Sequence, residues 1–208
     1  MPNYNDLVTD IKNYMEDDGV EFTASLPRFI DLAELRLSRD LVVPAFRQRS
    51  TSTLTQNDAF LTLPTDLIVL ENLHTVTTNV RKILLLRSDE FMMEYWPNRT
   101  ATGSPKYYSY FDTSTIYVAP TPATNIPIEI SYRRRLPALD SSSNTTNWIT
   151  DHAYDVLLYA CLIEASSFNR NDAMLQKYTQ LYGQGVQAVN KEGNLRLSID
   201  NFYQKSEG

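Results

Sequence analysis

Three side chains in the last third of the chain have the types and spacing of an acid–base cluster: Asp151, His152 and Asp155. On a helix Asp151 and Asp155 are one turn apart, and His152 is adjacent to the first of them. The same pattern is typical of a helix start, where acidic side chains interact favourably with the helix dipole. We favour this structural interpretation, with a small enzyme that uses His152 as an alternative function.

The rest of the sequence offers little material for catalysis. It lacks the HExxH and GxSxG patterns, a phosphate-binding loop and paired cysteine–histidine spacings, and its alternating context makes His74 a sheet-surface residue. The single cysteine, Cys161, excludes a disulfide framework, and its apolar neighbours are typical of an inert buried thiol. We therefore predict that the protein is not an enzyme and has no catalytic residue, no cofactor and no metal.

Thirteen tyrosines are the compositional surplus of the chain. Tyr107, Tyr108 and Tyr110 lie near Trp96 in the sequence, and such a group is typical of a platform on which sugars stack. Tyrosines are also good strand formers and are enriched in protein interfaces. We predict that these three tyrosines serve in the core and at a subunit or tail interface. The alternative is a carbohydrate-binding module, in which sugar quenches Trp96 fluorescence.

Arg133, Arg134 and Arg135 form the one basic run. On a strand, Arg133 and Arg135 share one face and Arg134 lies on the other. The run suits either phosphates or acidic side chains of a neighbouring chain. Because the flanking helices are acidic, we predict that the run lies at a subunit or tail interface.

The last fifteen residues, NLRLSIDNFYQKSEG, contain isolated apolar side chains that cannot form a core alone. Such side chains are unfavourable as exposed disorder unless they fold on binding. We therefore predict a C-terminal arm that docks on a partner through Leu195, Leu197, Ile199, Phe202 and Tyr203.

Length and charge restrict the classes further. A chain of 208 residues with 42% hydrophobic residues makes one large domain or two small ones with a real core. No apolar run approaches the roughly 20 residues of a membrane-spanning helix, and the N-terminus lacks a signal pattern, so we expect a cytosolic protein without a membrane. The net charge of −6 argues against tight nucleic-acid binding, but not against a position beside DNA.

The elements that position these side chains begin with two helices. The first is predicted to be capped by Asn5 and stopped by Gly19. The second is predicted to begin at Ser25, to hold Pro27 in its first turn and to end before Pro44.

Between residues 47 and 135 the apolar spacing changes to period two, with turn residues every eight to twelve positions, which is typical of antiparallel sheet. Ser88 is predicted to cap a short helix that Pro97 ends, and Asp112 begins the turn of a tight hairpin. The predicted strands cover 49–55, 60–63, 67–76, 82–86, 106–111, 115–118 and 126–133.

Helical spacing resumes after the Ser-, Thr- and Asn-rich stretch at 138–147. One helix is predicted from Thr150 or Asp151 to Phe168, and another, capped by Asn171, to about residue 191. The predicted fold is α+β. It consists of an antiparallel bundle of two N-terminal and two C-terminal helices (1–46 and 148–193), an inserted small antiparallel β domain (47–147) and an extended C-terminal arm (194–208).

Three segments in this order carry a resemblance to a known family: ELRLSRDL at 34–41, FLTLPTDLIVLENLHTV at 60–76 and WITDHAYDVLLYACLIEAS at 148–166. With the β insert and the tail, they make the chain resemble the head-to-tail adaptors of tailed bacteriophages, also called tail tubular protein A. The resemblance covers nearly the whole chain, and the order and size of the parts carry it.

The resemblance implies a structural virion protein: a ring of twelve subunits in the neck, between the portal protein and the tail tube or nozzle. The C-terminal arm would reach the portal, and tail fibres are a further candidate partner. Genomic DNA would pass through the channel during packaging and ejection without sequence-specific binding. Such a protein is made in the cytoplasm of the bacterial host. Another tail- or neck-completion protein remains an alternative.

Overall fold

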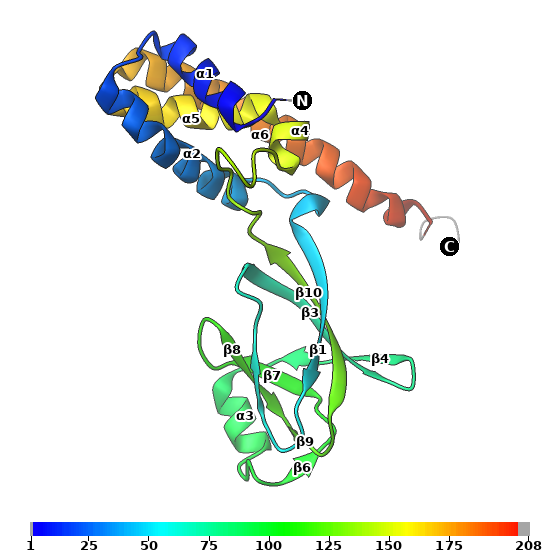
Figure 1. Cartoon of the computed structure of the whole chain (residues 1–208). Coiled ribbons are helices and arrows are strands. Elements are labelled where there is room, and N and C mark those ends of the chain that lie inside the picture. Colours follow the sequence, from blue (N-terminus) through cyan, green and yellow to red (C-terminus); the bar gives the residue numbers. More distant parts are fainter. Residues whose placement is uncertain (1, 204–208) are drawn as a thin grey trace. The chain divides into compact units, whose positions relative to one another are not determined.

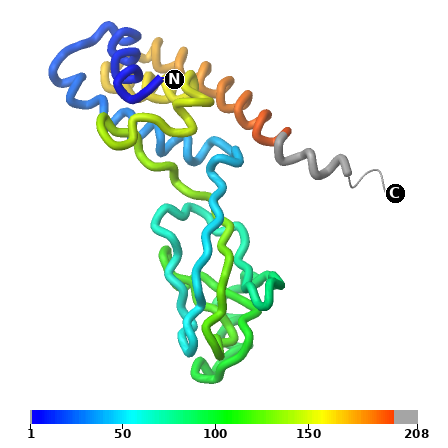
Figure 2. The backbone as a smooth tube through the Cα atoms, turned by 45° about the vertical axis from the view of Figure 1, so that its right-hand side comes forward, coloured from blue at the N-terminus to red at the C-terminus, as the bar shows by residue number. Residues whose placement is uncertain are grey.

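A computed structural model shows the protein as two compact units (Figure 1). It describes residues 2–203, and the side chains of residues 2–195. Within that range the helical unit comprises 2–46 and 136–203, and the β unit comprises 47–135. The chain enters the β unit through strand β1 (Arg47–Leu54) and leaves it through β10 (Ile126–Arg134), and these strands run side by side (Figure 2). The α+β class is confirmed.

The stretch 138–147, which the sequence suggests belongs with the β domain, packs in the helical unit instead. Leu139 is buried in the helical core, and its backbone N–H donates to Glu34 Oε2 over 3.2 Å. Asn147 donates to the other oxygen of the same carboxylate over 3.0 Å. The polar stretch is held because a buried carboxylate accepts its hydrogen bonds.

Helix α1 (Tyr4–Met15) presents an apolar stripe to this core. Its cap is Asn3 rather than the predicted Asn5, and the Asp6 side chain completes a capping box with the Asn3 backbone. The helix ends at Glu16, which adopts a positive φ of 50°. Gly19, the predicted stop, has no positive φ and begins the next helix instead.

Helix α2 (Val20–Asp40) begins one and a half turns before the predicted start. Ser25 does not cap it; its hydroxyl donates to the Glu21 carbonyl inside the helix. Pro27 lies within the helix rather than in its opening turn. The stripe from Phe22 to Leu37 explains the early start, because tertiary burial outweighs the propensity of one proline. A short 3₁₀ turn, η1 (Pro44–Phe46), follows.

The predicted single helix after residue 150 is two helices, α4 (Trp148–His152) and α5 (Tyr154–Phe168). Ala153 separates them because its backbone is not helical, with φ −145° and ψ 39°. Asn147 caps α4, in place of the predicted Thr150 or Asp151. Helix α5 is the centre of the unit and packs against α1, α2, α4 and α6.

Helix α6 (Asp172–Tyr203) is longer than predicted. Asn171 accepts from the backbone N–H of Met174, as expected of a cap. The segment from residue 194, predicted to be an extended arm, is helical up to Tyr203, and α6 continues through Gly193 without a break. A Cβ on Gly193 would lie 2.5 Å from the Val42 carbonyl oxygen, so the absence of a side chain lets α6 approach this backbone.

The β unit contains two four-stranded sheets. Sheet A has the order β1-β10-β3-β4, and all its pairs are antiparallel. Sheet B has the order β2-β8-β7-β5. The remaining bounds are β2 (Phe60–Thr62), β3 (Leu67–Thr77), β4 (Val80–Ile83), β5 (Leu85–Leu86), α3 (Asp89–Tyr95), β6 (Thr102–Gly103), β7 (Tyr107–Tyr110), β8 (Thr115–Ala119) and β9 (Thr121–Pro122).

Apolar side chains of both sheets form one core cluster, with Leu73 and Ile130 from sheet A and Ile116 and Val118 from sheet B. Two short pairs, β5 with β7 and β6 with β9, are parallel, so the prediction of a wholly antiparallel domain is wrong in these places. Helix α3 begins at the predicted cap, since Ser88 accepts from the Phe91 N–H. It covers β7 and adds a second, smaller cluster.

Candidate interaction surfaces

The tyrosines of strand β7 differ in what they offer a partner. Tyr107 packs edge-on against Phe91 and Tyr95, with ring centroids 5.2 and 4.9 Å apart. Tyr108 is buried, and burial raises the pKa of its hydroxyl. Tyr110 is exposed. Of these three side chains, Tyr110 is the most exposed and therefore the most accessible to a neighbouring molecule.

Trp96 does not form an open platform with these rings. Its indole Nε1–H donates to the Ala101 carbonyl over 3.0 Å, and the ring packs beside the smaller core cluster. The aromatic rings therefore contact one another rather than lie flat for a sugar. The structure gives the carbohydrate-binding alternative no geometric support.

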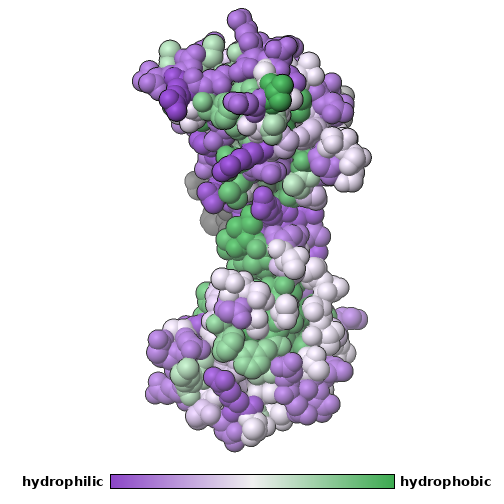
Figure 3. Space-filling view, turned by 60° about the vertical axis from the view of Figure 1, so that its left-hand side comes forward, coloured by the Kyte–Doolittle hydropathy of each residue, from purple (hydrophilic) through white to green (hydrophobic). Residues whose placement is uncertain are grey.

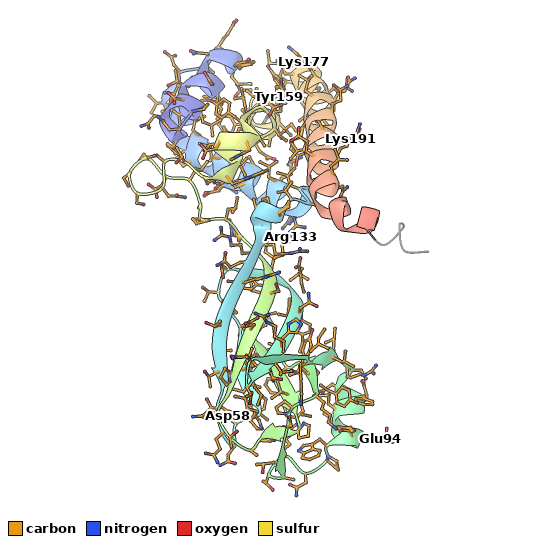
Figure 4. All side chains as sticks on the ribbon, turned by 90° about the vertical axis from the view of Figure 1, so that its right-hand side faces the viewer. Asp58, Glu94, Arg133, Tyr159, Lys177 and Lys191 are labelled. Carbon is orange, nitrogen blue, oxygen red and sulfur yellow. The ribbon has the colours of Figure 1, made fainter. Side chains whose placement is uncertain are left out.

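The basic run lies at the C-terminal end of β10, where Figure 4 labels Arg133. Arg133 and Arg134 are half-buried, and the sheet register shifts between them. Arg135 lies beyond the strand, with its backbone N–H donating to the Asp66 carbonyl over 2.7 Å. The predicted two-face alternation therefore stops with the strand at Arg134, and the extra residue of the register shift lies on β3, opposite the run.

The acid–base cluster of the alternative function does not form on a single helix. The helix break at Ala153 places Asp151 on α4 and Asp155 on α5, so they are not one turn apart on a single helix. The His152 ring stacks on Trp148 at 5.1 Å, with its Nδ1 3.2 Å from the Trp148 carbonyl oxygen. Both acids and the histidine are exposed, as in the structural interpretation.

Cys161 is fully buried on α5, and burial raises the pKa of its thiol well above the ordinary value. The negative charges of Glu34 and Glu164 act in the same direction. Such a thiol is a poor nucleophile because little thiolate forms. Among the described residues, no group of three or more His, Cys, Asp or Glu side chains is arranged to hold a metal ion.

The predicted arm lies on the last turns of α6. Leu195 is 59% exposed. The side chains of the other four predicted residues, Leu197, Ile199, Phe202 and Tyr203, lie outside those that the structure describes. No helix within residues 2–203 is long and apolar enough to span a membrane.

Sequence reasoning missed one surface, the outer face of sheet A. It holds a hollow of about 220 Å³ beside Arg49, His74, Arg81 and Glu129, which come from four different strands. Arg81 Nε donates to Glu129 over 2.6 Å. The alternation of arginine and threonine from Arg47 onward is the sequence signal of this face.

Large apolar side chains are also exposed on the β unit, and Figure 3 shows one face on which apolar groups gather over it. The exposed residues are Phe60, Ile68, Val69, Val80, Ile83, Leu85, Leu86, Met93, Tyr95, Tyr110 and Phe111. Contiguous exposed apolar groups are typical of surfaces that bind other proteins. The β unit is therefore a candidate interaction surface.

Comparison with known families places the chain in one of them. No curated protein matches the chain. The family model described as SU10 adaptor protein matches residues 2–200 and so includes both the helical and the β unit. The chain belongs to the SU10 adaptor protein family, a family of bacteriophage head-to-tail adaptors.

Proposed function

We propose that the protein forms a ring of twelve subunits that joins the portal to the tail tube or nozzle and continues the DNA channel. The match of the family model over residues 2–200 carries this proposal. A match to one unit alone would suit a shared domain used for another purpose, whereas this match includes both units. The site of action is the virion neck, after synthesis in the host cytoplasm.

The charge of the chain is suited to a channel through which DNA slides. Twelve copies at −6 each carry −72. Acidic walls repel the phosphate backbone, so DNA is not gripped during packaging or ejection. Reversal of acidic side chains that line the channel is expected to slow ejection, and unchanged ejection would count against this part of the proposal.

The end of α6 is proposed to bind the portal. Asn190 fixes the helix before this segment: its Oδ1 accepts from the Val42 N–H over 2.6 Å, and its Nδ2 donates to the Asp40 carbonyl over 2.9 Å. Gly193 is the last buried residue of the described part of α6. Residues 194–208 therefore follow the anchored part of the helix and are proposed as the portal-binding arm.

The experiment is to mix the chain with purified portal rings and to image the product by electron microscopy. The full chain is expected to add a second ring to the portal. A variant that lacks 194–208 is expected to lose this attachment and to keep the circular dichroism of the full chain apart from the helical signal of the deleted turns at 194–203. The matched control lacks only 204–208 and retains all five predicted arm residues. Native affinity of the longer deletion would refute the arm.

The β unit is proposed to supply contacts to the neighbouring subunit and to the tail. Exposed Tyr110 and Arg135 are the members of the predicted interface groups best placed for this role. Tail fibres are a further candidate partner. The Tyr110→Ser variant is expected to bind the nozzle more weakly than the native chain in a pull-down. The buried Tyr108 is the same in the variant and in the native chain.

A further inference from the structure

The outer face of sheet A is continuous across all four strands. One row of paired residues runs from Thr51 through Glu129 and His74 to Ile83. The core residues Ile128 and Ile130 alternate with Glu129 along β10, so this row lies on the side away from the core. The hollow of about 220 Å³ opens on this face.

The cations of this face differ in whether they have partners. Arg47 Nε lies 2.7 Å from Glu71, and Arg81 Nε lies 2.6 Å from Glu129. Within the described side chains, the Arg49 guanidinium makes no hydrogen bond or ion pair, although it acts on Glu129 through charge. The hollow therefore has an arginine fork with the geometry to bind one more carboxylate.

The helical unit carries carboxylates that also lack partners. Glu16, Asp18 and Glu21 are exposed at the turn between α1 and α2, and in the described part of the chain their carboxylates form no hydrogen bond or ion pair. Between them, Val20 is 86% exposed. This acidic turn combines negative charge with an apolar side chain at its tip.

We propose that the acidic turn of one copy docks on the outer face of sheet A of a second copy, with a carboxylate on Arg49 and Val20 near Ile83. Ile83 is 52% exposed and supplies apolar area beside the charged group. The two surfaces differ, so the contact is heterologous and repeats from copy to copy, as a closed ring requires. This inference rests on the proposed function and identifies a contact between its subunits.

Charge complementarity favours a second copy over nucleic acid. Residues 1–46 and 136–208 hold 17 acidic and 9 basic side chains, whereas residues 47–135 hold 8 acidic and 10 basic. DNA binding uses many cations along the backbone. On this face two of the arginines already bind Glu71 and Glu129, whose carboxylates repel phosphate.

Cross-linking tests the contact in the full chain. The native Cys161 is buried, so introduced cysteines react selectively. A chain with Val20→Cys and Ile83→Cys, the two positions that the proposal brings together, is treated with a short bis-maleimide, free at high concentration and bound to portal rings. We expect a ladder of trimers and larger products, because each copy links to two others. The control pairs Val20→Cys with Met93→Cys, an exposed residue on α3, and is expected to give no ladder.

Charge reversal then tests the ion pair within the cross-linkable chain. Arg49→Glu is expected to lower the yield of the ladder about tenfold, and added Asp18→Lys and Glu21→Lys are expected to restore it. Circular dichroism checks that each variant folds. A ladder that is absent both in solution and on portal rings, or that is insensitive to Arg49→Glu, overturns the inference.

The outcomes separate this contact from the proposed function. If portal rings bind the chain and the ladder is absent, the subunit contact is wrong and the adaptor role stands. If the ladder forms and portal rings do not bind, the contact stands and the adaptor role fails. If Arg49→Glu leaves the ladder unchanged and instead lowers affinity for duplex DNA, the face binds nucleic acid and the inference is overturned.

Discussion

The helical unit and the β unit use apolar residues in opposite ways. In the helical unit, side chains from α1, α2, α4, α5 and α6 form one continuous core. The β unit divides its core into two smaller clusters. Among the described side chains, eleven of the large apolar residues that are exposed belong to the β unit and six to the helical unit. The difference indicates that the helical unit buries most of its large apolar residues in its own core, whereas the β unit leaves more of them exposed.

Polar contacts at the edge of the core also join the helices of the helical unit. The Tyr182 hydroxyl donates to Asp40 over 2.7 Å, and the Tyr154 hydroxyl donates to Asp10. Arg36 pairs with Glu164. Each contact joins helices that are far apart in sequence, so the unit is held together by specific hydrogen bonds as well as by burial.

A cavity in the core around α5 is expected to have the largest effect on the stability of the helical unit. Leu157→Ala removes a fully buried side chain from the centre of the helical core and is expected to lower its free energy of unfolding by about 3–5 kcal/mol. Urea denaturation followed by circular dichroism measures the change. Leu32→Ala, at a partly exposed site on α2, is the control and is expected to cost less than about 1 kcal/mol. Equal losses in both variants would contradict a single packed core.

The two glycines near the middle of α6 test how closely this helix packs in the helical unit. A Cβ on Gly185 would lie 2.9 Å from Val156 Cγ2, so Gly185→Ala is expected to destabilise the helical unit by about 1–3 kcal/mol. A Cβ on Gly183 would meet nothing within 4 Å, so Gly183→Ala is expected to stabilise it by up to about 1 kcal/mol. Thermal unfolding measures both, and effects of the same sign would show that α6 does not approach α5 at Gly185.

High pH is expected to weaken the tyrosine contacts. Burial and the hydrogen bond to Asp40 raise the pKa of Tyr182 above its ordinary value of 10.0, and burial with Asp10 does the same for Tyr154. The unfolded chain loses these protons first, so the stability that they contribute is present below pH 10 and falls as pH rises above it. Tyr182→Phe is expected to cost about 1 kcal/mol at pH 7 and to flatten this fall. An unchanged alkaline slope in the variant would contradict the assignment.

Surface changes in the β unit are expected to have the smallest effect on stability. Leu86→Ser replaces an exposed apolar side chain on edge strand β5, so it is expected to change the free energy of unfolding by less than about 0.5 kcal/mol. The same change is expected to raise solubility, because it removes an exposed apolar group from the surface. Denaturation and solubility measurements check the two effects, and a large loss of stability would show that Leu86 belongs to the core.

The sequence predicts those elements whose signal is local. The stripe of α1, the Ser88 cap and the hairpin at Asp112 depend on spacing and on the chemistry of one residue, and they appear in the structure. The start of α2 was missed because Pro27 is tolerated where burial on both sides supports the helix. The parallel pairing of β5 depends on tertiary contacts that no local pattern records. The start of α4, by contrast, has a local signal that was overlooked, the capping box of Asn147 and Thr150.

The candidate interaction surfaces likewise combine features with a local sequence signal and features that depend on the fold. The alternation that begins at Arg47 indicates an exposed polar face, but the hollow beside Arg49 needs His74 and Arg81 from other strands. The register shift opposite the arginine run likewise arises from pairing with β3. Residues far apart in sequence create both features, so only the fold reveals them.

Native mass spectrometry of the chain with purified portal rings tests the central claim most directly. The account predicts a complex that holds twelve copies of the chain on each portal ring, with few partly filled rings, because each bound copy offers a surface to the next. A portal ring that carries a single copy, or none at concentrations where both components are folded, would contradict it.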